Sequence, residues 1–142
     1  MEKMETVVER LKERGFKITP QRIAIVKTLQ KKNYHPSAEI IYNKLRAEFP
    51  SISLTTVYKT LDILCSMGEL KEIYISGERV LYDPNNTPHH HFICKKCLRI
   101  IDMPQTMSSK WSLPALYKDK IEVTSFRVDF FGYCGRCRKI FQ

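Results

Sequence analysis

The chain has 142 residues, of which 43% are hydrophobic and 27% charged, a composition typical of one ordinary globular domain or two small ones. No apolar run approaches the ~20 residues that a membrane span requires, and the charged start "MEKMETVVERLKERG" does not resemble a secretory signal. We therefore expect a cytoplasmic protein, whose five cysteines stay reduced and bind metal rather than form disulfides.

The formal net charge of +9 suggests a polyanionic partner. Residues 1–83 hold 14 Lys/Arg against 11 Asp/Glu, a net of +3, and residues 84–142 hold 10 against 4, a net of +6. Four thiolates on a divalent zinc ion would lower the second value to +4. Charge alone therefore does not locate a nucleic-acid surface.

Helix signals fill the first part of the chain. Residues 2–14 carry an apolar stripe that Gly15 ends. Thr19 as N-cap and Pro20 at the first helical position predict a second helix. After the break at "NYHPS", Ser37 is expected to cap a third helix, which ends before Pro50. This helix carries Ile40, Ile41 and Leu45.

A fourth helix is predicted to open at Ser53 and to end at Gly68. Its apolar side includes Val57, Leu61 and Cys65, and we expect the Cys65 thiol to pack in the core. The segment "ELKEIYISGERVLYDP" then predicts a β-hairpin. Helices followed by a hairpin predict a winged helix-turn-helix. The polar side of the fourth helix carries Thr55, Tyr58, Lys59 and Asp62.

The second part begins after a linker, "DPNNTPHH" (83–90). We expect strands at "HFIC" and "LRIID", a helix from about Thr106 to Lys118, and a long strand at "IEVTSFRVDFFGY" (121–133). The predicted fold class is α+β, a winged helix-turn-helix followed by a small α/β domain. The expected boundaries are 1–83 for the first domain, 84–88 for a hinge and 89–142 for the second domain.

Two Cys-x-x-Cys pairs lie in the second part, at Cys94 and Cys97 and at Cys134 and Cys137. Four sulfur ligands select zinc, or less often an iron–sulfur centre. A redox-active pair is the alternative, but two such pairs in so small a lobe favour metal. A lobe of about 60 residues has a small hydrophobic core, and a structural metal would stabilise it. We predict one structural Zn²⁺ per chain.

The run "HHHFICKKC" (89–97) predicts a second site, because side chains alternate across a strand. His89 and His91 share one face, and Cys94 lies on the other. If Cys94 and Cys97 oppose each other in an antiparallel hairpin, the residue numbers of every opposed pair add up to 191. His89 then faces Asp102. Imidazole with carboxylate suits Fe²⁺, Mn²⁺ or Zn²⁺. The alternative is a histidine that only satisfies a hydrogen bond.

The chain resembles the ferric uptake regulator family of metal-dependent repressors, most of all its peroxide-sensing branch. The resemblance covers nearly the whole chain, in a specific order of short motifs. They are "GFKITPQR" (15–22), "SLTTVYKTL" (53–61), "RVLYD" (79–83), "HHHFICKKC" (89–97), "IID" (100–102) and "GYCGRC" (132–137).

The resemblance implies a homodimer, with an N-terminal winged-helix DNA-binding domain and a C-terminal dimerisation domain. It implies structural zinc on the four cysteines. One regulatory Fe²⁺ or Mn²⁺ per chain is implied on His35, Asp83, His89, His91 and Asp102, with His35 and His89 as the targets of oxidation. The DNA-binding residues expected in this reading are Lys17, Gln21, Arg22, Thr55, Thr56, Tyr58 and Lys59.

The sequence departs from the family pattern in three respects. Lys17 and Lys59 stand where the family usually has Arg, which keeps the charge but loses bidentate geometry. The segment "TSFRVDFFGY" lacks the histidines that many relatives use for an additional metal, so we expect no third site. Asp83 and Asp102 stand where iron-uptake regulators tend to have Glu.

We therefore predict a homodimeric repressor of palindromic operator DNA that senses peroxide through iron. An iron-, manganese- or zinc-uptake regulator of the same family is the first alternative. A non-haem iron oxygenase is another, but five candidate ligands leave little room for substrate, so we expect no enzyme. A zinc-ribbon interaction protein is the third. We expect no membrane and no small organic substrate among its partners.

Overall fold

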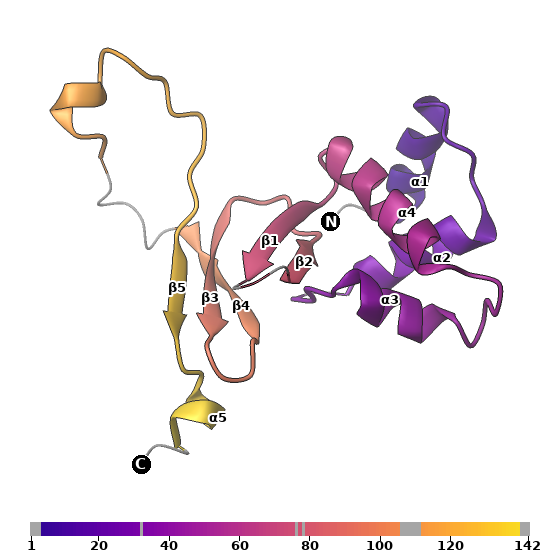
Figure 1. Cartoon of the computed structure of the whole chain (residues 1–142). Helices are drawn as coiled ribbons and strands as arrows, with labels where there is room; N and C mark the ends of the chain where they lie inside the picture. The colour runs from indigo at the N-terminus through magenta and orange to yellow at the C-terminus, as the bar shows by residue number, and fades with distance from the viewer. Residues whose placement is uncertain (1–3, 32, 76, 78, 106–111, 140–142) are drawn as a thin grey trace. The chain divides into compact units, whose positions relative to one another are not determined.

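The computed structural model describes residues 4–31, 33–75, 77, 79–105 and 112–139. The chain divides into two compact units, Met1–Asn86 and Thr87–Gln142. Within the described residues the first unit has four α-helices and a two-stranded sheet, and the second has a three-stranded sheet and short helical segments (Figure 1). We refer to them as the first and the second unit.

Three of the four helices of the first unit begin where their capping residues predict. Thr19 Oγ1 accepts a hydrogen bond from the Arg22 N–H at 3.2 Å, and Ser53 Oγ accepts one from the Thr56 N–H at 3.0 Å. Such bonds satisfy N–H groups that have no partner inside the helix. The helices are α1 (Met4–Glu13), α2 (Pro20–Leu29), α3 (Ala38–Leu45) and α4 (Leu54–Ser66).

The core of the first unit lies between these helices. Cys65 is half buried and packs against it, as predicted. Ile40 lies outside the core, because its side chain is 50% exposed. α3 buries Ile41 and Leu45, and Ile40 lies about 100° around the helix from Ile41, outside that narrow stripe. The buried residues of the core include Val7, Leu11, Ile25, Val26, Leu29, Ile41, Leu45, Val57, Leu61 and Leu64.

The predicted hairpin forms from β1 (Lys71–Ile75) and β2 (Arg79–Asp83), which pair antiparallel. The N–H of Tyr82 in β2 also donates to the carbonyl of Pro36 at 2.9 Å. This bond ties the end of β2 to the loop that precedes α3. It therefore brings the residues beside Pro36 and Tyr82 close together.

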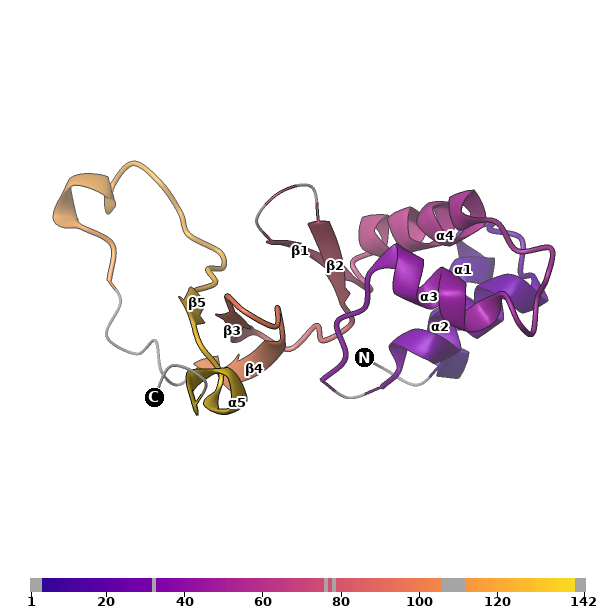
Figure 2. The same cartoon turned by 60° about the horizontal axis from the view of Figure 1, so that its bottom comes forward.

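The sheet of the second unit has the strand order β4-β3-β5. β3 (His89–Cys94) pairs antiparallel with β4 (Ile100–Pro104) and parallel with β5 (Asp129–Gly132). The three strands lie side by side in both views (Figures 1 and 2). A short helix, α5 (Gly135–Arg138), follows β5. β5 is thus an edge strand of the sheet in the described part of this unit.

Two predictions for the second unit are wrong over most of the residues that the structure describes. Residues 106–111 of the predicted helix lie outside the described residues, and 112–118 contain only the 3₁₀ segment η2 (Ala115–Tyr117). Residues 121–128 of the predicted strand form no ladder, and only 129–132 pair with β3. The chain from 112 to 128 extends away from the sheet in Figure 2. A strand needs a neighbour, and the described unit gives 121–128 none.

Candidate metal centres and nucleic-acid interface

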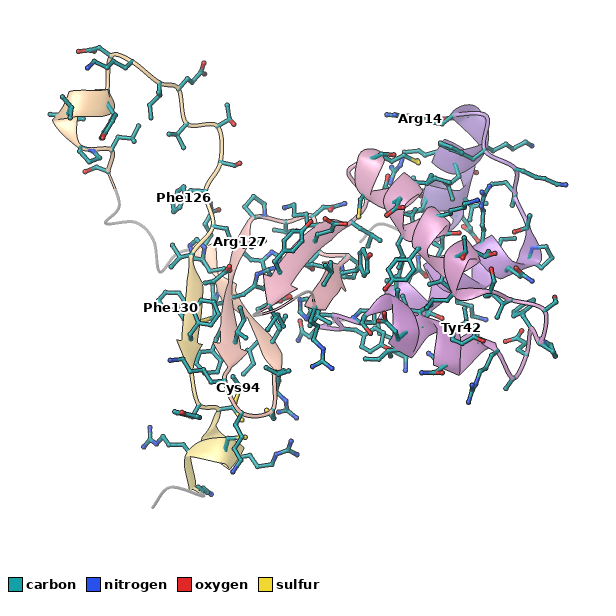
Figure 3. The ribbon with its side chains drawn as sticks, viewed as in Figure 1. Arg14, Tyr42, Cys94, Phe126, Arg127 and Phe130 are labelled. Carbon is teal, nitrogen blue, oxygen red and sulfur yellow. The ribbon has the colours of Figure 1, made fainter. Side chains whose placement is uncertain are left out.

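The four cysteines of the two pairs converge in the second unit. Cys94 ends β3, Cys97 lies in the turn to β4, Cys134 precedes α5, and Cys137 lies within it. The N–H of Lys95 donates to the carbonyl of Gly132 at 2.8 Å and joins the two segments that carry the pairs. All four sulfur atoms lie within 4.8 Å of one another. Figure 3 shows Cys94 beside α5.

This cluster has the geometry of a tetrahedral zinc site. A zinc ion with Zn–S bonds of about 2.3 Å separates its sulfur ligands by about 3.8 Å. The Sγ atoms of Cys97 and Cys134 lie 3.7 Å apart, and no disulfide joins them. Cys94 and Cys137 are buried, so the ion would be shielded from water. The residues therefore fit structural zinc.

Backbone groups prepare part of the cluster as thiolate. The N–H groups of Cys97 and Cys134 lower the pKa of the Cys94 thiol to about 6. The N–H of Cys137 likewise lowers the pKa of Cys134, whereas burial raises the pKa of Cys137 to about 12. A bound divalent ion supplies the charge that deprotonates such a buried thiol.

A second set of donors lies on the opposite face of β3. The Nε2 atoms of His89 and His91 are 2.8 Å apart, and Asp102 Oδ1 lies 3.6 Å from the first and 3.7 Å from the second. Ligands of an octahedral ion with bonds of about 2.1–2.2 Å lie about 3 Å apart. The three donors therefore fit one divalent cation. The thiolates and the outer histidines form separate sites, as predicted.

The predicted register of this hairpin is wrong by two residues. His91, not His89, is the partner of Asp102, and His89 pairs with Pro104. The turn is longer than a two-residue turn, because Leu98 adopts a left-handed conformation with φ of 57° and its N–H donates to the Cys94 carbonyl. A shift of two residues keeps each side chain on its face, so Asp102 still reaches both histidines.

The remaining two predicted ligands belong to the first unit. His35 Nε2 lies 3.6 Å from Asp83 Oδ1, and both side chains are almost fully buried. The hydrogen bond from the Tyr82 N–H to the Pro36 carbonyl brings this pair together, because Pro36 follows His35 and Tyr82 precedes Asp83. Asp83 Oδ1 also accepts from the N–H of Asn85 at 2.8 Å. The five predicted regulatory ligands thus form two groups, one in each unit.

α4 presents the polar side that the sequence predicts. Thr55 and Lys59 are exposed, and Tyr58 is 38% exposed. The Tyr58 hydroxyl donates to Glu39 Oε1 of α3 at 2.6 Å. This hydrogen bond raises the pKa of Tyr58 and lowers that of Glu39. The tyrosine is therefore held in one orientation before any DNA is bound.

The other expected DNA-binding residues gather around one groove of about 510 Å³. Arg22 donates to the carbonyl of Lys17 at 2.5 Å, and Gln21 donates to Ser51 Oγ at 3.4 Å. The groove lies at the N-terminus of α2, where the helix dipole and the cations of Lys17 and Arg22 favour an anion. It is lined by Lys17, Thr19, Pro20, Gln21, Arg22, Phe49 and Thr56.

Comparison with known proteins now decides the family. The sequence model of the ferric uptake regulator family matches residues 13–131. The chain belongs to the ferric uptake regulator family. Members of this family are metal-responsive transcriptional regulators and not enzymes. None of the helices in the described part of this family member has both the length and the apolarity needed to span a membrane.

Individual relatives of this ferric uptake regulator family member are similar over nearly its whole length. The peroxide-responsive repressor PerR of Staphylococcus aureus is 32% identical over 135 residues, which cover 95% of this chain and 91% of the relative. The structure of the Helicobacter pylori ferric uptake regulator, described with three functional metal-binding sites, has a TM-score of 0.82 at 25% identity and covers 96% and 95% of the two chains. The α+β fold class is confirmed.

A third relative bears on function. The structure of PerR from Streptococcus pyogenes, a protein of peroxide sensing and gene regulation, has a TM-score of 0.56 at 31% identity. It covers 96% of this chain and 94% of that chain. The family member described here thus resembles both branches, and it carries the metal-site donors described above.

Sequence reasoning missed two carboxylates of this family member. Glu39 contacts Tyr58 across 19 residues of sequence, and Asp129 faces His91 from β5. Neither contact follows from a periodicity, because each joins elements that only the tertiary fold brings together. The β3–β5 pairing would have indicated Asp129, but a parallel pair with a long connection has no local turn signal.

Proposed function

We propose that this family member is a homodimeric, metal-dependent repressor that binds palindromic operator DNA in the cytoplasm and senses peroxide through iron. In this proposal residues 1–83 form the DNA-binding domain, 84–88 the hinge and 89–142 the dimerisation domain. Each chain holds one structural Zn²⁺ on its four cysteines and one regulatory Fe²⁺ or Mn²⁺.

One observation carries the proposal: the regulatory donors divide between the units. The first unit offers His35 and Asp83, and the second offers His89, His91 and Asp102. Fe²⁺ or Mn²⁺ takes roughly six ligands, more than either group provides. One ion bound by both groups would fix the DNA-binding domain against the dimerisation domain. Metal would then shift the population toward dimers that fit the operator.

DNA would be read by α4. Its exposed Thr55, Tyr58 and Lys59 suit a recognition helix in the major groove. Lys17 and Arg22, at the groove beside α2, would neutralise backbone phosphates and add salt-dependent affinity. Gln21 and Thr56 would add neutral contacts from the same groove.

The dimer would form through the edge of the second unit. Ile121, Val123 and Phe126 are 45–49% exposed, and residues 121–127 belong to no ladder in the described unit. A second copy of the same segment would cover these apolar side chains and complete the sheet. The two-fold axis of such a dimer requires a palindromic operator.

Peroxide would act on the histidines. Bound Fe²⁺ supplies the chemistry that makes hydrogen peroxide an oxidant of nearby imidazoles. His35 and His89 would each gain one oxygen atom at an imidazole carbon, while the other oxygen of peroxide leaves as water. An oxidised imidazole is a poor ligand, so the link between the two domains is lost and repression ends.

The experiment compares the two metals. Zinc-loaded protein is purified without oxygen, given Fe²⁺ or Mn²⁺, exposed briefly to peroxide and titrated onto operator DNA selected from a random pool. We expect the Fe²⁺ form to lose operator binding and the Mn²⁺ form to keep it. Mass spectrometry should find one added oxygen on the peptides of His35 and His89. If neither gains oxygen with iron bound, the sensor proposal is wrong.

The likeness to the H. pylori ferric uptake regulator favours a second candidate, a regulator that responds to metal level alone. That function predicts metal-dependent operator binding without loss on brief peroxide exposure. The same experiment therefore distinguishes the two candidates.

A further inference from the structure

The imidazole of His91 lies between two carboxylates. Its Nε2 is 3.7 Å from Asp102 Oδ1 in β4, and its Nδ1 is 3.6 Å from Asp129 Oδ1 in β5. The ring itself is 1% exposed. Asp102 belongs to the proposed regulatory ligands, whereas Asp129 faces the nitrogen that points away from them.

The backbone fixes this arrangement. His91 and Asp129 are direct partners in the parallel ladder of β3 and β5, so their side chains leave the sheet on the same face. The His91 N–H donates to the carbonyl of Val128 at 3.2 Å, one residue before Asp129. The contact therefore follows from strand pairing rather than from a mobile side chain.

Asp129 is in turn held by Arg127. The guanidinium Nε lies at ion-pair distance, 3.0 Å, from Oδ1, and Nη2 donates a hydrogen bond to Oδ2 at 3.1 Å. Figure 3 shows Arg127 beside the N-terminal end of β5. Arg127 therefore orients the Asp129 carboxylate and places a positive charge beside it.

We propose that Asp129 is a positioning residue for the regulatory site, an inference that rests on the proposed function. Its charge holds the proton of His91 on Nδ1, which leaves the Nε2 lone pair directed at His89 and Asp102. A carboxylate behind a ligating imidazole fixes the tautomer and makes the imidazole a stronger ligand. The separation of 3.6 Å is longer than a hydrogen bond, so the carboxylate acts on the neutral imidazole through its charge.

The two outer histidines are therefore oriented by different groups. His89 Nδ1 lies 2.6 Å from the carbonyl of Thr87, a neutral acceptor in the chain that leads into β3. His91 is oriented by a charge on β5. Because Asp129 is the first residue of β5, regulatory metal on His91 also stabilises the β3–β5 pairing, and with it the strand edge proposed for the dimer.

The test measures Mn²⁺ affinity of the zinc-loaded, full-length protein. Asp129→Asn keeps the shape and removes the charge, and we expect Mn²⁺ to bind about 10–100-fold more weakly, with zinc retained. Asp129→Glu, which restores the carboxylate, should recover part of that loss. Glu122→Gln removes an exposed charge from the same segment and should bind Mn²⁺ as the wild type does.

A second readout reports on His91 itself. In zinc-loaded protein without Mn²⁺, NMR of the imidazole nitrogens should show the proton of His91 on Nδ1 in the wild type. In Asp129→Asn it should move in part to Nε2. A merely structural role for Asp129 would leave this tautomer unchanged.

The outcomes separate this inference from the proposed function. If His91→Ala binds as much Mn²⁺ as the wild type does, His91 holds no regulatory metal. Both proposals would then be wrong. If His91→Ala removes Mn²⁺ but Asp129→Asn binds it like the wild type, only the role of Asp129 falls. Equal weakening in Glu122→Gln would overturn that role as well, because it would show a general charge effect.

Discussion

The hydroxyl of Tyr58 has a fixed hydrogen-bonding role, because it donates its hydrogen bond to Glu39. A phenol oxygen has one proton to donate and two lone pairs. In this orientation Tyr58 would meet DNA as an acceptor in the proposed complex, which suits the amino groups of adenine and cytosine in the major groove. Its exposed ring can also contact the methyl group of thymine. Glu39 is therefore part of how α4 presents its polar side.

Tyr58→Ala should lower the discrimination between operator and random DNA by about 1–3 kcal/mol, because base contacts carry sequence information. Tyr58→Phe keeps the ring and removes only the hydroxyl, so it separates the two contributions. Both variants are titrated onto both DNAs at one salt concentration. Equal losses of affinity for operator and random DNA would mean that Tyr58 contacts the DNA backbone rather than the bases.

The length of the side chain at position 102 also matters. Asp102 Oδ1 lies within 3.7 Å of both outer histidines, so one extra methylene changes how the carboxylate reaches a shared ion. We expect Asp102→Glu to keep metal-dependent operator binding and to blunt the loss that peroxide causes in the Fe²⁺ form. The fraction of binding that survives brief peroxide exposure measures this. Unchanged peroxide sensitivity would contradict the role assigned to Asp102.

Among the elements, the turn of β3 and β4 and the helix α5 depend most on the cysteine cluster. Cys97→Ser should release zinc, unfold the second unit and abolish the dimer, because structural zinc contributes on the order of 10 kcal/mol to such folds. Zinc content, circular dichroism and size-exclusion chromatography would show this. Cys65→Ser is the matched control, since its thiol packs in the first unit and should leave zinc in place. A folded, zinc-containing Cys97→Ser dimer would disprove the four-cysteine site.

The sequence predicts elements well where the signal is local. Thr19, Ser37 and Ser53 cap the helices that they were expected to cap, because a cap depends on a few neighbouring residues. The register of β3 and β4 fails at Leu98, whose left-handed conformation lengthens the turn. A glycine there would have signalled such a turn, but leucine gives no warning.

Residues 121–128 show a different limit. Their β-branched and aromatic residues are typical of a strand, yet a ladder needs a second strand, and residues 121–127 have none in the described unit. The pattern predicts an intrinsic preference, whereas the partner is a property of the assembly. The proposed dimer would supply that partner.

For the whole molecule, the proposed regulatory site is the part that sequence patterns explain least. His89, His91 and Asp102 follow from alternation on two adjacent strands. His35 and Asp83 lie in a loop and at the end of β2, and one hydrogen bond between Tyr82 and Pro36 brings them together. No periodicity links such positions, so only the family resemblance indicated them.

The central claim is that donors from both units hold one regulatory ion. It is tested by counting the Mn²⁺ bound per zinc-loaded chain in the wild type, His35→Ala and His91→Ala at one free Mn²⁺ concentration, with operator affinity measured in parallel. The account predicts one Mn²⁺ per wild-type chain and higher operator affinity, and neither in either variant. A His35→Ala chain that keeps its Mn²⁺ while His91→Ala loses it would contradict the account, because the second unit alone would then hold the ion.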